Sequence, residues 1–127
     1  MMSKYLPAAV WSNSRGTTAV EFAIVVPVAI TLFVGSLYLC MALFVAGSLH
    51  YAVEEGARCA SVNTSTCGNA GAITSYAKTH YFGPGSAPTF SYAAAACGNS
   101  VSATVTYTAN LGFTMMTIPI SAAACFP

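Results

Sequence analysis

The sequence predicts an α+β protein, in which a long N-terminal transmembrane α-helix precedes a small disulfide-stapled domain with a short helix and antiparallel β-strands. Three observations support this prediction. The run from Phe22 to Leu49 contains no charged residue, four of the five cysteines follow it, and the C-terminal part alternates apolar residues with Ser and Thr. Only 6% of the 127 residues are charged and 56% are hydrophobic, as is typical of a membrane protein.

The apolar run divides the chain into three expected segments. A polar cytoplasmic stretch covers residues 1–16, a long helix covers 17–62 and spans the membrane at about 22–49, and a small extracytoplasmic domain covers 63–127. About 20 apolar residues cross a hydrocarbon core roughly 30 Å thick, so the run is long enough to span with tilt. A secretory signal peptide would have an apolar core of only about 7–15 residues, which disfavours cleavage after the run.

Charges on either side of the run predict its orientation. Lys4 and Arg15 are the only charged residues before Glu21, and both are positive. The positive-inside rule then places the N-terminus in the cytoplasm and the residues after about 50 outside. Past the run, Glu54 and Arg58 are four residues apart with the acid first, which predicts an ion pair on one helix face.

The outer half contains signals for one helix and three strands. The stretch "NAGAITSYAKTHYF" predicts a short helix, and "NSVSATVTYTAN" alternates apolar and hydroxyl residues as a half-buried strand does. A second strand, "TIPISAAACF", follows a turn near "NLGF", and "TFSYAAAA" is the third candidate. These signals predict an antiparallel hairpin with one more strand beside it.

Four cysteines lie on the predicted outer side, namely Cys59, Cys67, Cys97 and Cys125. An even set in an oxidising compartment favours disulfides, and four cysteines allow three pairings. We favour a local Cys59–Cys67 bridge, together with Cys97–Cys125, because the predicted hairpin brings the latter two opposite each other. Zinc binding is the alternative, but the chain has no CxxC and no paired histidine spacing. Cys40, inside the apolar run, is interpreted as a small apolar filler.

Composition argues against catalysis and against nucleic-acid binding. No Asp or Glu follows Glu55, so His80 has no acidic partner in the outer half, and no nucleophile or phosphate-loop motif is present. We therefore expect no enzyme activity, no cofactor and no metal site. The net charge of +1, without a basic patch, makes nucleic acid an unexpected partner.

A family resemblance rests on the residues at the start of the helix and just beyond the apolar run. Arg15 and Gly16 are followed by small residues, by Glu21 five positions after the glycine, and by a long apolar helix, which resembles a prepilin processing site. Together with "AVEFA" and the later "EEGAR", the stretch from Arg15 to Val62 resembles the TadE-like pilus assembly proteins of bacterial Tad (Flp) pilus systems.

The resemblance implies a minor pilin-like (pseudopilin) component of the Tad machine, active in pilus assembly and adhesion. It implies that a prepilin peptidase cuts after Gly16, that Thr17 becomes the new N-terminus and that residues 1–16 are a leader. It also implies that Glu21 takes part in assembly by pairing with the free amine of a neighbouring subunit. The implied partners are the peptidase, other pilin or pseudopilin subunits, the Tad inner-membrane machinery and the lipid bilayer of the bacterial inner membrane.

Two alternatives stay open at this point. In the first, the chain is an unprocessed single-pass membrane protein whose outer domain binds a partner or an envelope component, and Glu21 reaches the cytoplasmic headgroups. In the second, the chain is a pseudopilin of a secretion system. The sequence does not distinguish retention in the membrane from incorporation into a pilus.

Overall fold

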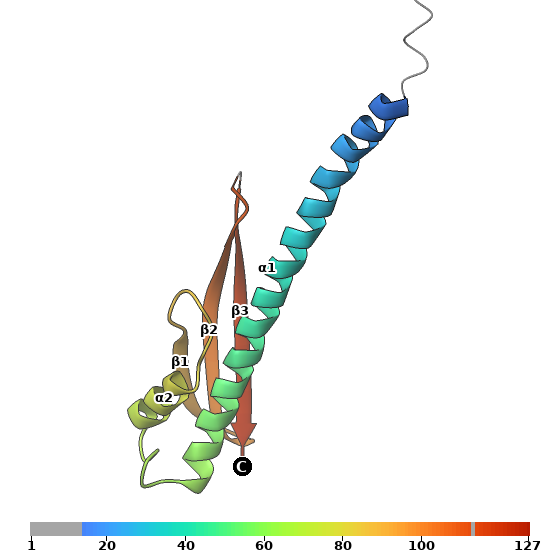
Figure 1. Ribbon diagram of the computed structural model, residues 1–127. Coiled ribbons are helices and arrows are strands. Elements are labelled where there is room, and N and C mark those ends of the chain that lie inside the picture. The colour runs from blue at the N-terminus through green and yellow to red at the C-terminus, as the bar shows by residue number, and fades with distance from the viewer. Residues whose placement is uncertain (1–13, 113) are drawn as a thin grey trace, which may run out of the picture. The chain divides into compact units, whose positions relative to one another are not determined.

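The computed structural model describes residues 14–112 and 114–127, and it has the expected α+β fold (Figure 1). In chain order its elements are α1 (Ser14–Val62), α2 (Ala70–Thr79), β1 (Thr89–Ala95), β2 (Gly98–Asn110) and β3 (Met115–Phe126). Each helix and strand expected from the sequence is present. Lys4 and most of the expected leader lie outside the described residues.

The chain divides into two compact units, and the boundary lies inside α1 between Leu37 and Tyr38. We call the described residues 14–37 the N-terminal unit and residues 38–127 the sheet unit. The sheet unit therefore includes the second half of α1 as well as α2 and the three strands.

The three strands form an antiparallel meander in the order β1-β2-β3. A two-residue turn joins Ala95 to Gly98, whose φ of +117° suits glycine. A Cβ at Gly98 would also collide with the carbonyl oxygen of Phe126, so this turn packs directly against the end of β3. The strand β2 extends beyond its last partner in β1, so the far part of the β2–β3 hairpin is two-stranded (Figure 1).

One face of the sheet packs against the second half of α1. The alternating residues Val101, Ala103 and Val105 of β2 are buried, and Ala122 of β3 joins them in the core cluster. The helix contributes a stripe at spacings of three and four residues, as expected for one buried helix face. The stripe consists of Val45, Ser48, Leu49, Ala52, Val53, Gly56, Ala57 and Ala60.

The turn between α1 and α2 is held by hydrogen bonds of two asparagines and by a disulfide. The backbone N–H of Asn63 donates to the carbonyl of Cys59 (2.9 Å), and the Asn63 side-chain oxygen accepts from the N–H of Thr66 (3.2 Å). The Cys59–Cys67 disulfide closes this turn with a Cα–Cα distance of 5.8 Å. Asn69 then caps α2 by accepting a hydrogen bond from the N–H of Ala72 (2.9 Å).

The second disulfide joins Cys97 in the β1–β2 turn to Cys125 at the end of β3, with a Cα–Cα distance of 6.2 Å. Ser100 pairs with Cys125 in the sheet register, so the hairpin brings the two cysteines together as the sequence reasoning expects. Both favoured disulfides are present. In the chain-entropy model, loops of these lengths contribute about 2.5 kcal/mol for Cys59–Cys67 and about 3.6 kcal/mol for Cys97–Cys125.

Candidate functional site

The implied processing bond joins Gly16 to Thr17, in the first turn of α1. Both residues are exposed, and a Cβ placed on Gly16 would meet no atom within 4 Å. The first four N–H groups of a helix have no acceptor inside it, so a cut here removes little of the hydrogen-bond ladder.

The next feature is the exposed carboxylate of Glu21, one helical turn past Thr17. Its neighbours Val20 and Phe22 are large apolar side chains, 61% and 69% exposed. Among residues 14–112 and 114–127, no hydrogen bond or ion pair involves Glu21. An acid set among exposed apolar side chains requires water or a cationic partner.

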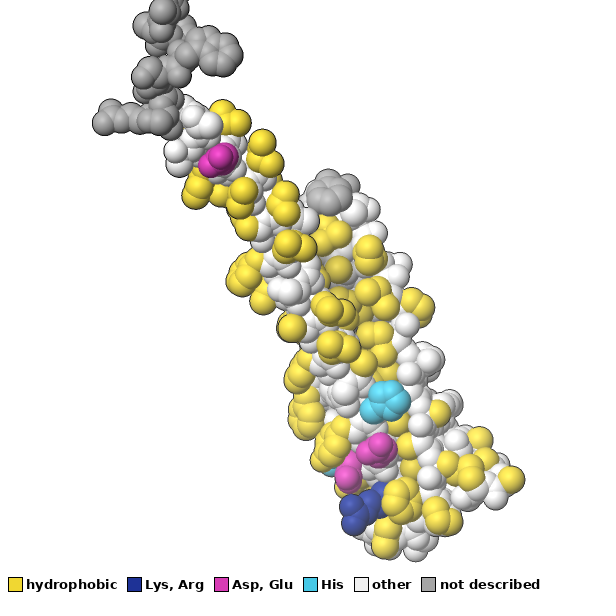
Figure 2. Space-filling view, turned by 90° about the vertical axis from the view of Figure 1, so that its right-hand side faces the viewer, with side chains coloured by type: hydrophobic (Ala, Val, Ile, Leu, Met, Phe, Trp, Pro, Cys, Tyr) yellow, Lys and Arg dark blue, Asp and Glu magenta, His cyan; other side chains and the backbone are white. Residues whose placement is uncertain are grey.

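Exposed apolar side chains follow Glu21 along the N-terminal unit (Figure 2). In that view the hydrophobic side chains cover the helix, and an acidic group is visible near the start of its described part. One helix, Gly16–Val62, is long and apolar enough to cross a membrane. The exposed large side chains before Tyr38 are Val20, Phe22, Ile24, Val25, Val28, Ile30, Leu32, Phe33, Val34 and Leu37.

Polar groups inside this apolar stretch are satisfied by the helix itself. Thr31 donates its hydroxyl to the carbonyl of Pro27 (2.8 Å), and Ser36 donates to the carbonyl of Phe33 (2.7 Å). Such bonds remove the cost of placing a hydroxyl in an apolar environment. Beside Pro27, a shallow apolar notch of about 280 Å³ opens between Val28 and Leu32. This notch and the open face at Gly35 offer room for a side chain of another helix.

Burial divides the expected span of 22–49. Val45, Ser48 and Leu49 are covered by the protein itself, in the core of the sheet unit. The stretch Gly16–Leu37, in contrast, has no buried residue. Its 16 residues after Glu21, Phe22–Leu37, extend about 24 Å at 1.5 Å per residue, which is most of the thickness of a hydrocarbon core.

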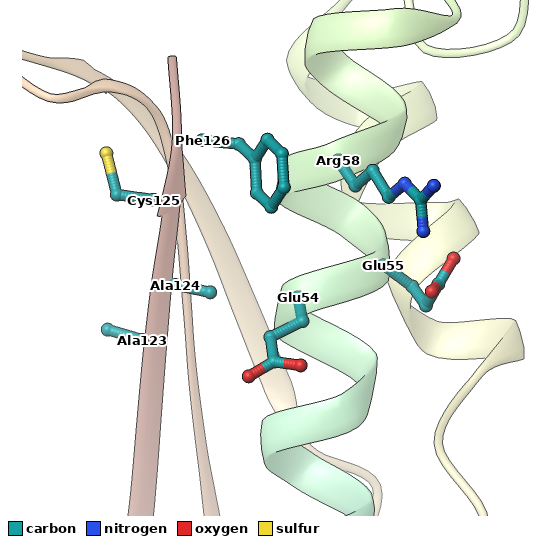
Figure 3. Close-up of a pocket in the computed structure, with 7 residues that line it drawn as sticks. All are labelled: Glu54, Glu55, Arg58, Ala123, Ala124, Cys125 and Phe126. Atoms are coloured by element: carbon teal, nitrogen blue, oxygen red, sulfur yellow. The ribbon is translucent and has the colours of Figure 1, made fainter.

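The charged residues of the sheet unit on α1 line a groove of about 500 Å³ beside the end of β3 (Figure 3). The predicted pair of Glu54 with Arg58 is wrong, because no ion pair forms between them in the described structure. Figure 3 shows the reason: the Glu54 side chain points toward β3, whereas Arg58 extends on the side of Glu55. The four-residue spacing therefore did not produce an ion pair between Glu54 and Arg58, because their side chains extend in different directions.

Sequence reasoning also missed why Gly56 lies in this helix. A Cβ on Gly56 would lie 3.0 Å from the Cβ of Ala77 in α2 and 3.5 Å from Val101 in β2. The glycine lets α1 approach both elements closely. The buried stripe on α1 repeats every three or four residues from Val45 onward, and this period is the signal that could have revealed the contact.

Around the end of α2, the His80 ring packs against the rings of Tyr51 and Tyr76. His80 caps α2, and its Nδ1 lies 2.9 Å from the carbonyl oxygen of Tyr76. The Tyr81 hydroxyl is buried with no hydrogen-bond partner among the described residues, and burial raises the pKa of Tyr81 above its ordinary value. Within the described residues, no group of three His, Cys, Asp or Glu side chains is placed to hold a metal ion.

Comparison with known families identifies the segment that carries these N-terminal features. The family model described as TadE-like protein matches residues 16–58, and this confirms the resemblance over those residues. The match covers about a third of the chain, from Gly16 through the apolar helix to Arg58. No curated protein and no solved structure matches the chain.

Proposed function

We propose that this TadE-like chain is a minor pilin-like (pseudopilin) component of a bacterial Tad/Flp pilus assembly system. It acts without catalysis, through packing of its N-terminal helix and addition of subunits, in pilus biogenesis and adhesion. The observation that carries the proposal is Glu21, an exposed carboxylate without a partner among the described residues, on an otherwise apolar helix. The match to the TadE-like family over residues 16–58 supports it.

The proposed mechanism begins with cleavage after Gly16 by a prepilin peptidase. Cleavage leaves an α-amino group on Thr17, and such groups have a pKa near 8, so most are cationic at neutral pH. The Glu21 carboxylate of one subunit then pairs with the Thr17 amine of the next, in surroundings where opposite charges attract more strongly than in water. This pairing sets the axial register between neighbouring helices.

The exposed apolar side chains of the N-terminal unit contact two different environments in this proposal. Before assembly, residues 16–37 lie in the bacterial inner membrane, with the N-terminus in the cytoplasm and the sheet unit in the periplasm. During assembly the same side chains contact other pilin or pseudopilin helices and the Tad inner-membrane machinery. The notch beside Pro27 and the open face at Gly35 are the places where close contact costs least.

The deciding experiment combines N-terminal mapping with one isosteric substitution. Protein from cells that contain the peptidase should begin at Thr17, and protein from cells that lack it should begin at Met1. Glu21→Gln should insert into the membrane normally and reduce the amount of surface pili. Each 1.4 kcal/mol lost from the pair lowers the affinity of a subunit for the growing end by about tenfold.

Glu54→Gln is the matched control, since it neutralises an exposed acid on the same helix outside the N-terminal unit. It should leave pilus number unchanged. If the chain begins at Met1 in both strains and Glu21→Gln assembles normally, the alternative of an unprocessed single-pass membrane protein replaces the proposal.

A further inference from the structure

We propose that the tip of the β2–β3 hairpin inserts into the outer face of the lipid bilayer, beside the point where α1 leaves the sheet unit. The tip consists of the described residues 110–112 and 114–118. The inference rests on the membrane-spanning part of the proposed function and adds a second lipid contact to it. Its evidence is the position of the tip along α1, its composition and the exposure of both its faces.

A hydrogen bond fixes the position of the tip along α1. The Tyr38 hydroxyl donates to the backbone carbonyl of Asn110, the last residue of β2. Tyr38 is the first residue of the sheet unit, directly after the stretch in which no residue is buried. Tyrosine is enriched at the boundary between lipid and water, where its ring is apolar and its hydroxyl finds a partner.

The length of the apolar helix places that boundary beyond Leu37. With the Glu21 charge at the cytoplasmic edge, Phe22–Leu37 supplies 16 residues, which cover about 24 Å of a core about 30 Å thick. The remaining roughly 6 Å falls on the next four residues, Tyr38–Met41. Leu39 and Met41 are exposed and apolar, as residues in lipid should be. The tip, bonded to Tyr38, lies at the same level.

The composition of the tip suits lipid. No residue after Lys78 carries an Asp, Glu, Lys or Arg side chain, so insertion of the tip buries no charge. Met115 is 67% exposed, Met116 is 51% exposed, and Ile118 is also among the exposed large hydrophobic residues. Flexible methionine side chains adapt readily to an irregular apolar environment.

The exposure of both faces favours lipid over a second copy of the chain. Successive residues of a strand point to opposite faces, so Met115 lies on one face of the ribbon and Met116 on the other. A protein partner would cover one face, whereas lipid surrounds both. The turn keeps its own backbone bonds, with the N–H of Leu111 donating to Thr114 (2.9 Å) and that of Gly112 to the Asn110 side chain (2.9 Å).

The depth of insertion has a physical limit. The outward N–H and C=O groups of a two-stranded ribbon need water or headgroups, so the tip stops near the boundary of headgroups and acyl chains. Interfacial segments enter this region by about 5–10 Å, which agrees with the roughly 6 Å left by the helix.

Depth-dependent quenching of single tryptophans tests the inference in the full chain. Trp11→Phe removes the only tryptophan, and Met115→Trp, Phe126→Trp and Leu32→Trp are then made one at a time in this background. The vesicles contain phosphatidylethanolamine and phosphatidylglycerol, with or without brominated phosphatidylcholine. Phe126 is exposed at the other end of β3, so Phe126→Trp carries the same interfacial preference of tryptophan at a position expected in water.

The inference expects strong quenching of Leu32→Trp, clear quenching and blue-shifted emission of Met115→Trp, and unquenched emission of Phe126→Trp. If Met115→Trp is quenched no more than Phe126→Trp while Leu32→Trp is quenched, the tip contact is overturned and the span stands. A blue shift of Met115→Trp that follows protein density without bromine quenching identifies a second copy and also overturns it. If Leu32→Trp is not quenched, the helix does not insert, and the membrane part of the proposed function fails first.

Discussion

The two halves of α1 differ in what covers their side chains. They share one uncharged run, since no charged residue lies between Phe22 and Leu49. From Gly16 to Leu37 most large side chains are exposed and no residue is buried. After it, a stripe of small and apolar residues is buried against the sheet unit. Hydropathy alone therefore marks both halves as membrane helix, whereas the period of the small residues marks only the second as a protein core.

The largest expected difference between the two halves is in the free energy of unfolding when one leucine in each half is truncated. Leu49 is fully buried and Leu32 is 70% exposed. Leu49→Ala should lower the free energy of unfolding of the sheet unit by about 2–5 kcal/mol, because it leaves a cavity in the core. Leu32→Ala should leave it unchanged. Urea titration in detergent, followed by near-UV circular dichroism, measures this, because six of the seven tyrosines lie in the sheet unit.

Equal losses from the two leucine variants would contradict the division at Tyr38. In that case the sheet unit would depend on the N-terminal unit for its stability, and the two halves of the helix would form one cooperative body.

A smaller effect is expected from adding one methyl group in each half. Gly56→Ala should destabilise the sheet unit by about 1 kcal/mol, because the new methyl group meets Ala77 at 3.0 Å and the overlap exceeds the gain in helix propensity. Gly35→Ala meets no atom within 4 Å and should leave the sheet unit unchanged. The same urea titration applies, and an unchanged or higher stability of Gly56→Ala would show that α2 moves aside freely.

The smallest effect concerns pH and the buried Tyr81 hydroxyl. Burial raises the pKa of Tyr81, so the folded state favours the neutral phenol. Its contribution is complete below the unfolded pKa of about 10 and is lost as the pH rises through the folded value. Tyr81→Phe should weaken the loss of sheet-unit stability above about pH 10 and leave the helicity of residues 14–37 unchanged. If Tyr81→Phe loses as much stability at alkaline pH as the unsubstituted chain does, another group is responsible for the loss.

Local patterns predicted the fold where they did not depend on distant contacts. The alternation of Val101, Ala103 and Val105 located β2, and the hairpin it implies paired Cys97 with Cys125. These features follow from strand period and turn chemistry, which act over a few residues.

Patterns failed where a contact between distant elements decided the outcome. The Glu54–Arg58 spacing gave no ion pair, since the two side chains extend in different directions, and Gly56 is explained only by its approach to Ala77 and Val101. The bond between Tyr38 and Asn110 joins residues 72 positions apart, and no local signal predicts it. At the candidate site, Gly16, Thr17 and Glu21 were found by spacing and family resemblance, and their roles in processing and assembly stay predictions.

The two ends of the sheet unit differ in the number of bonds that hold them, because both disulfides lie at the same end. Cys59–Cys67 and Cys97–Cys125 both lie at the end where Ser61 bonds to Phe126 and Asn99. At the opposite end, the bond from the Tyr38 hydroxyl to Asn110 is the one hydrogen bond between helix and hairpin among the described residues. Thermal opening between helix and hairpin should therefore start at the hairpin tip, where fewer bonds hold the two together. A force applied through the helix would separate the hairpin from α1 at the tip first, while Cys97–Cys125 holds β3 to the β1–β2 turn.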